Sequence, residues 1–182
     1  AGNLCNASPA ADGVPALLVL DADVELSSSA AVRHLPLADF ILGNRRTARR
    51  SDELVTAVRV PKASLGGSSA FVKLGARRYL VISIAMAAVR LVVEDNTIRH
   101  AAIAVGACSA VATRLPGIEH GLVGRRLDGP LTDTIESASV PQLAPIDDVR
   151  GSATYRLAAA REIVVRAVQA AASQFPEREV AA

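Results

Sequence analysis

Runs of alternating polar and apolar residues predict several β-strands in the first third of the chain. Residues 23–26 alternate strictly, three serines follow as a turn, and residues 32–37 form a second run. Alternation of this kind is typical of half-buried strands, and the short turn joins the two runs as a hairpin. A third run, residues 54–60, is rich in β-branched side chains and stops at Pro61, where a strand is expected to end.

Two longer apolar runs predict the clearest hairpin of the chain. Residues 82–94 and 97–105 flank Asp95 and Asn96, a pair of residues suited to a tight turn. The first arm is apolar on both of its sides, so we expect a strand that is covered on both faces. Alanine and methionine also favour helices, and a helix over residues 78–88 is therefore the competing interpretation.

Helical spacing of apolar residues is strongest over residues 153–173, where Ser152 is placed to cap the helix. The polar positions of this segment are expected to face away from the core: Arg156, Glu162, Arg166 and Gln169. Shorter helical segments are predicted at residues 10–20, 38–43, 112–123 and 130–137.

A glycine- and serine-rich connection, residues 62–69, separates the β-rich runs into two groups. We therefore expect two subdomains, residues 1–65 and residues 66–176. Antiparallel hairpins combined with separate helices indicate the α+β class, with antiparallel sheets and helices packed on one face.

Composition argues against several classes of function. The net charge is only +2 and the arginines are spread along the chain, so no nucleic-acid footprint is present. Two cysteines are too few for a disulfide framework or a metal site. The longest apolar run, residues 81–93, is interrupted by Ser83 and Arg90 and is too short to span a membrane. Since no secretory pattern is visible, we expect a cytoplasmic protein without a bound metal.

No residue pattern supplies a catalytic acid, base or nucleophile. The three histidines are isolated, and neither a nucleophile elbow nor a metalloprotease motif occurs. Asp21 and Asp23 are interpreted as the solvated entry to a strand. Asp147 and Asp148 precede a helix beside Arg150, a setting that favours ion pairs and helix caps.

The opening segment is the strongest candidate for a binding site. Residues 2–12 (GNLCNASPAAD) place glycine, asparagine, serine and aspartate just before an apolar run. Such a turn presents backbone N–H groups and short polar side chains to an anionic ligand. The same residues also suit an ordinary loop before a helix, in which Asp12 is only a cap.

Several motifs, in their order along the chain, resemble one protein family. Besides residues 2–12 they are residues 39–40 (DF) with Gly43, 52–54 (DEL), 60–61 (VP), 71–78 (FVKLGARR), 145–152 (PIDDVRGS) and 155–156 (YR). Together they resemble the FAD-binding medium subunits of molybdenum hydroxylases, the family of xanthine dehydrogenase and carbon monoxide dehydrogenase. The resemblance extends over nearly the whole chain. In that family a further flavin-binding half precedes the first motif, and we expect this N-terminal half to be absent here.

The resemblance implies that the chain binds FAD and supplies no catalytic side chain, because the isoalloxazine ring carries the redox chemistry. It implies contacts from the opening turn to the pyrophosphate and ribityl chain, and a hydrogen-bonding role for Asp12. A lysine at the flavin corresponds to Lys73, for which a surface lysine on a strand is the alternative. The implied cofactor-binding residues are Gly2, Asn3, Asn6, Ser8, Ala11, Asp12, Leu54, Val55 and Lys73.

The resemblance also implies partners. They are a [2Fe-2S] small subunit and a molybdopterin large subunit, with electrons passing from substrate through the clusters to FAD and then to NAD or another acceptor. A separate chain would supply the other flavin-binding half. The alternative function is that of a flavin-free truncated module that serves only to dock other subunits.

Overall fold

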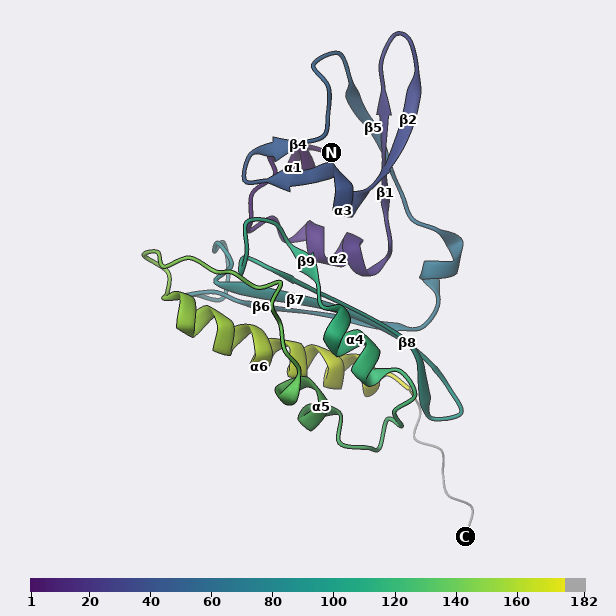
Figure 1. Ribbon diagram of the computed structural model, residues 1–182, viewed down its shortest axis with the longest axis vertical. Coiled ribbons are helices and arrows are strands. Elements are labelled where there is room, and N and C mark those ends of the chain that lie inside the picture. Colours follow the sequence, from purple (N-terminus) through teal and green to yellow (C-terminus); the bar gives the residue numbers. More distant parts are fainter. Residues whose placement is uncertain (176–182) are drawn as a thin grey trace.

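The computed structural model describes residues 1–175 and arranges their strands in antiparallel sheets (Figure 1). Pro176, the last residue of the second predicted subdomain, lies outside the described residues. The strands are β1 (Asp23–Ser27), β2 (Val32–Pro36), β3 (Ile41–Gly43), β4 (Arg46–Thr47), β5 (Leu54–Arg59), β6 (Ser68–Leu74), β7 (Ala85–Glu94), β8 (Thr97–Gly106) and β9 (Thr113–Arg114). The helices are α1 (Gly2–Asn6), α2 (Gly13–Val19), α3 (Leu37–Phe40), the 3-10 helix η1 (Lys62–Leu65), α4 (Pro116–Leu122), α5 (Leu131–Ser137) and α6 (Ala153–Ala172).

The predicted long hairpin forms the centre of a four-stranded sheet in the order β6-β7-β8-β9. Asp95 and Asn96 make its turn, and both have positive φ angles. The competing helix over residues 78–88 is wrong, because Ala85 to Ala88 pair with β6 on one side and with β8 on the other. The backbone groups of residues 85–88 form their hydrogen bonds with the neighbouring strands and not along a helix.

Helices cover both faces of this sheet (Figure 1). One face packs against α4, α5 and α6 through a core that includes Val89 of β7 and Ile103 of β8. The other face packs against α2 through the small side chains of Ala88 and Ala104. The predicted class is confirmed, namely α+β with antiparallel sheets and α4 to α6 on one face, and α2 is an additional cover on the opposite face.

The approach of α2 to the sheet is close. A Cβ atom on Gly106 would lie 2.5 Å from Cε of Met86 and 3.0 Å from Cγ of Pro15, a residue of α2. A Cβ atom does not approach other atoms this closely, so a larger residue at this position would force the Met86 side chain to move and would crowd Pro15.

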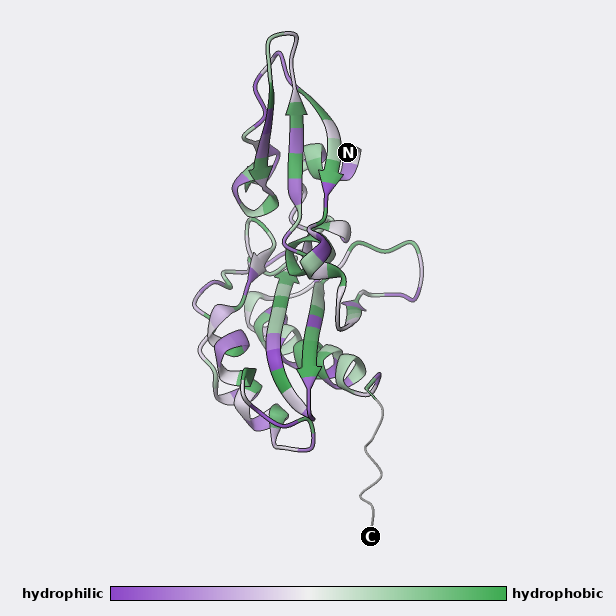
Figure 2. Ribbon diagram, turned by 90° about the vertical axis from the view of Figure 1, so that its right-hand side faces the viewer, coloured by the Kyte–Doolittle hydropathy of each residue, from purple (hydrophilic) through white to green (hydrophobic). Residues whose placement is uncertain are grey.

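The first hairpin is confirmed and lies in a separate three-stranded sheet of order β2-β1-β5. Val24 faces Leu35 across the β1–β2 pair. This sheet projects from the body of the molecule, and its strands carry more hydrophilic bands than those of the four-stranded sheet (Figure 2). The exposed surface of the projecting sheet explains the strict polar and apolar alternation in its sequence.

Two predicted helices differ from the observed elements at one end. Of residues 38–43, only the first part is helical, because Ile41 to Gly43 form β3 and pair with β4. Within residues 112–123, Thr113 and Arg114 form β9 and the helix begins only at Pro116. Proline favours the first turn of a helix because it has no N–H group that needs a partner there.

The last helix is capped as predicted, but one of its polar residues is buried. The N–H of Tyr155 donates to Oγ of Ser152 over 3.1 Å. Arg156, expected to face away from the core, is only 3% exposed. Its Nη1 donates to the carbonyl of Ile84 at 2.6 Å and to that of Ala107 at 3.1 Å. The Ile84 carbonyl comes just before β7 and the Ala107 carbonyl just after β8, and the guanidinium satisfies both.

A buried arginine ties the end of α2 to the sheet. Arg90 of β7 is 4% exposed, and its Nε donates to the carbonyl of Val19 at 2.9 Å. Its Nη2 lies 3.4 Å from Oδ2 of Asp21, whose other oxygen accepts from Nη1 of Arg114 at 2.9 Å. Asp21 is exposed and leads into β1, as expected for a solvated strand entry, but it is also held by two arginines that the sequence did not indicate.

We expect Arg90→Met to lower the free energy of unfolding by about 1–3 kcal/mol, since it leaves the Val19 carbonyl without its buried donor. Asp21 is half-exposed and keeps Arg114, so the larger loss typical of a fully buried ion pair is not expected. The measurement is urea unfolding, and Arg99→Met, which removes an exposed arginine from the same hairpin, is the control. Its free energy of unfolding should differ from that of wild type by less than about 0.5 kcal/mol. Equal effects of the two substitutions would show that Arg90 does not anchor α2.

Candidate functional site

Two residues named from the sequence lie in direct contact. Asp12 precedes the first residue of α2, and Lys73 lies in β6. Nζ of Lys73 lies 2.5 Å from Oδ2 of Asp12, and Oγ of Ser83 donates to Oδ1 of Asp12 at 2.6 Å. The carboxylate thus joins the opening segment to β6 and to the segment that leads into β7.

This ion pair changes the interpretation of both residues. The Asp12 side chain makes no capping hydrogen bond to α2, so helix capping does not account for it. The side chain of Lys73 is 28% exposed and bends onto Asp12 rather than extending into solvent. The Asp12 side chain remains 46% exposed, so the pair is accessible to a ligand.

The rest of the opening segment surrounds this pair only in part. Gly2 is exposed, and a Cβ atom added there would meet nothing within 4 Å, so a ligand has room beside its backbone. Asn3 is also exposed, and Oδ1 of Asn6 accepts from Nη1 of Arg45 at 2.6 Å. The backbone N–H of Ala10 donates to Oγ of Ser8.

Three of the implied residues are placed differently. Ala11 is 3% exposed and packs in the core beneath α2, so only its backbone can reach a ligand. Leu54 is 70% exposed and pairs with Ser27, at the far end of β1 from α2. Val55 is half-buried against the same core as Ala11. No contact in the described part of the chain joins Leu54 or Val55 to Asp12 or Lys73.

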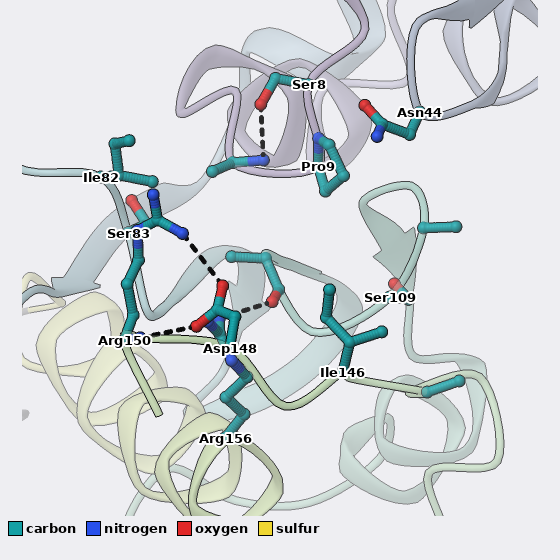
Figure 3. A pocket seen from close by; sticks show the side chains of 14 residues that line it. Ser8, Pro9, Asn44, Ile82, Ser83, Ser109, Ile146, Asp148, Arg150 and Arg156 are labelled. Atoms are coloured by element: carbon teal, nitrogen blue, oxygen red, sulfur yellow. Dashed lines mark hydrogen bonds and ion pairs between the residues drawn. The ribbon is translucent and has the colours of Figure 1, made fainter. Parts of the chain in front are cut away.

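Beside Ser83 lies a cavity of about 430 Å³ (Figure 3). Its lining comes from both the opening segment and the C-terminal part of the chain: Ser8, Pro9, Ala10, Asn44, Ile82, Ser83, Ala107, Ser109, Ala110, Ala144, Ile146, Asp148, Arg150 and Arg156. A volume of this size is typical of small-molecule sites. Ser83 and Asn44 were not predicted as site residues, because an isolated serine or asparagine carries no motif.

One wall of the cavity is an ion-pair cluster. Oδ1 of Asp148 accepts from Nη2 of Arg156 at 2.6 Å, and Oδ2 accepts from Nη1 of Arg150 at 3.0 Å. The backbone N–H of Arg150 and then the guanidinium of Arg156 lower the pKa of the Asp148 carboxyl from its ordinary 3.8 to about 2. Asp147 accepts from the N–H of Ala153 at the start of α6. The predicted roles of this segment in ion pairing and helix capping are confirmed.

Comparison with protein families identifies the chain. Residues 1–63 match the FAD binding domain in molybdopterin dehydrogenase, and residues 70–171 match the CO dehydrogenase flavoprotein C-terminal domain. The chain belongs to the CO dehydrogenase flavoprotein family. The family that the sequence motifs resembled is thereby confirmed, and FAD is the cofactor of its N-terminal domain.

Relatives of this flavoprotein family align over most of the chain. The glyceraldehyde dehydrogenase medium chain of Sulfolobus acidocaldarius is 32% identical over 163 residues, which are 90% of this chain and 56% of that protein. The nicotinate dehydrogenase FAD-subunit of Eubacterium barkeri is 35% identical over 146 residues, 78% of this chain and 48% of that one. The chain thus spans about half the length of these relatives.

A solved member of the CO dehydrogenase flavoprotein family has the same fold. Reconstituted CO dehydrogenase from Oligotropha carboxidovorans superposes with a TM-score of 0.87 at 30% identity, covering 96% of this chain and 60% of that chain. No helix among residues 1–175 is both long and apolar enough to cross a membrane.

The Asp148 cluster should stabilise the fold in a pH-dependent way. Because the folded-state pKa is lowered, its contribution is present above the ordinary pKa of 3.8 and is lost as the pH falls through about 2. We expect Asp148→Asn to melt at a lower temperature than wild type at pH 6, and the difference to shrink between about pH 4 and pH 2. Thermal unfolding of both proteins across this range tests it, with Glu162→Gln, which breaks an exposed ion pair of α6, as the control. A difference that stays constant with pH would contradict the assignment.

Proposed function

We propose that this chain is the part of an FAD-containing medium subunit in which Asp12 and Lys73 contact the flavin. The observation that carries the proposal is the 2.5 Å ion pair between them, which links the FAD-binding-domain match to the C-terminal-domain match. Both residues were implied as flavin contacts by the sequence, and the fold brings them together from 61 positions apart. The match of residues 1–63 to an FAD binding domain favours this function over the flavin-free docking module.

The chemistry of these side chains fits a flavin. The pyrimidine edge of the isoalloxazine ring alternates carbonyl acceptors with an N–H donor, and the ribityl chain carries hydroxyls. Lys73 supplies donors to carbonyl oxygens, and Asp12 supplies acceptors to N–H or hydroxyl groups. The open space beside the Gly2 backbone is suited to close approach of the ligand.

When bound, FAD supplies the redox chemistry, and the protein binds and orients it. The ammonium of Lys73 brings positive charge to the site, which favours phosphate groups and the anionic reduced form of the ring. Asp12 limits that effect, because its carboxylate neutralises Lys73 and fixes its position. Ser83 holds the carboxylate in place from the other side.

The remaining features of the subunit follow from the family. We propose that residues 1–65 form the second part of the flavin-binding domain and residues 66–176 the C-terminal domain. The proposed partners are a [2Fe-2S] small subunit and a molybdopterin large subunit, with electrons leaving FAD to NAD or another acceptor. The two free cysteines, Cys5 and Cys108, support a reducing compartment such as the cytoplasm.

We expect this chain alone to bind FAD weakly. The described contacts lie on one side of the ligand, whereas good sites bury roughly 70–90% of a drug-sized ligand. Protein purified without added FAD should show no flavin absorption near 370 and 450 nm (roughly, the bands of free flavin). Isolation with stoichiometric FAD would contradict this expectation.

We expect Asp12→Ala and Lys73→Ala to weaken FAD binding at least about tenfold in the flavoprotein assembled from this chain and the other flavin-binding half, because each loses a charge-assisted hydrogen bond. Lys62→Ala, which removes the other lysine of the chain, is the matched control. FAD affinity is measured by fluorescence titration, and the stability of the apo-protein by thermal unfolding.

The two measurements together separate flavin contact from structural support. Thermal unfolding shows how much stability Lys73→Ala loses with its ion pair to Asp12, so a tenfold loss of FAD affinity in a variant that is folded at the assay temperature reports on the flavin contact. If FAD affinity stays at its wild-type value while only stability falls, Asp12 and Lys73 are structural residues and the proposed site is wrong.

A further inference from the structure

The charges that line the cavity beside Ser83 are not balanced. Arg150 and Arg156 share the single carboxylate of Asp148, so the three charged residues of the lining carry one net positive charge. Of the neighbouring carboxylates, Asp12 is paired with Lys73, and Asp147 lies outside the lining and accepts from the N–H of Ala153 at the start of α6. The cavity therefore favours an anion over a cation or a neutral molecule.

Hydrogen-bond donors in the same lining lack acceptors within the described residues. Arg150 uses its backbone N–H and Nη1 on Asp148, which leaves the edge formed by Nε and Nη2 without a partner. Nε of Arg156 is buried and unpaired. The side-chain amide of Asn44 makes no hydrogen bond within residues 1–175, although it lines the opposite wall (Figure 3). Arg150 and Asn44 are exposed to solvent, so a ligand rich in acceptors would replace water at their free donors.

Apart from Ser8, Ser83 and Ser109, the remainder of the lining is apolar. Pro9, Ile82 and Ile146 face the cavity together with several alanines, as Figure 3 shows for the three labelled side chains. Ile82 and Ile146 are 53% and 71% exposed, although large aliphatic side chains are usually buried. A ligand with an apolar body would cover them and thereby remove apolar surface from water.

From these three observations we propose that the cavity binds a small organic carboxylate. Its carboxylate pairs with the free Nε and Nη2 edge of Arg150, the side-on geometry in which a guanidinium holds a carboxylate through two parallel hydrogen bonds. Its apolar body lies against Ile82 and Ile146. The volume of about 430 Å³ suits a molecule of this size. The proposal does not rest on flavin binding, because the contacts of the ligand are with Arg150, Ile82 and Ile146.

Benzoate is a suitable probe, and benzamide is its uncharged counterpart of equal shape. We expect benzoate to bind saturably with a dissociation constant of about a millimolar, as is ordinary for so small a ligand. Benzamide should bind at least about tenfold more weakly, because it cannot form the charge-assisted pair with Arg150. Inorganic phosphate should also bind more weakly than benzoate, since it has no apolar body. Titrations followed by amide chemical shifts show both the affinity and the location.

Substitutions at Arg150 give the decisive comparison. Arg150→Gln should weaken benzoate binding about tenfold and leave benzamide unchanged, while Arg150→Lys should recover part of the loss because it restores the charge. The fold is expected to tolerate both changes, since Asp148 keeps its bond to Arg156. Arg125→Gln, at an exposed arginine of the loop after α4, is the matched control and should leave both ligands unaffected.

Several outcomes would overturn the proposal. They are equal binding of benzoate and benzamide, phosphate binding as tight as that of benzoate, unchanged benzoate affinity in Arg150→Gln, or chemical-shift changes away from the cavity. The double substitution Asp12→Ala with Lys73→Ala removes both charges of the proposed flavin contact and is expected to leave benzoate affinity unchanged. The carboxylate site and the flavin site can therefore fail independently, and loss of benzoate binding in this double variant would show that the two are not separate.

Discussion

The burial of the β7–β8 hairpin on both of its faces is the constraint on which the rest of the structure depends. One face packs on α6 and the other on α2, so the N-terminal and C-terminal parts of the chain share the same sheet. The small side chains of Ala88 and Ala104, together with Gly106, let α2 pack closely against the sheet. Arg90 of β7 donates to the carbonyl of Val19, the last residue of α2, and this hydrogen bond fixes the position of the helix on the sheet.

This packing positions the functional residues. Because α2 is held against the sheet, Asp12 at its start lies next to Lys73 on the neighbouring strand β6 and next to Ser83 before β7. The same arrangement leaves the adjoining cavity between the opening segment and the Asp148 cluster. A flavin site and a carboxylate site can therefore lie side by side, with Ser83 between them, and yet depend on different charged residues.

Much of the fold was predictable because its signals are local. Alternation and turn residues identified the hairpins, and Ser152 identified the start of α6. Long-range contacts had no such signal: Arg156 was expected to face solvent, but the carbonyl that it satisfies at Ile84 is 72 positions away. The ion pairs of Asp21 were missed for the same reason, since Arg90 and Arg114 lie in distant strands. Within the site, family resemblance named Asp12 and Lys73, but no spacing rule indicated that they form an ion pair.

The most direct test of the central claim, that the Asp12–Lys73 pair faces the flavin, is to map FAD onto the chain by amide chemical shifts up to millimolar FAD. The account predicts that signals of Asp12, Lys73 and Ser83 shift together along one saturable curve, while those of His34 and Arg59 on the projecting sheet stay fixed. Shifts confined to the projecting sheet, or no shift at the Asp12–Lys73 pair at saturation, would contradict it.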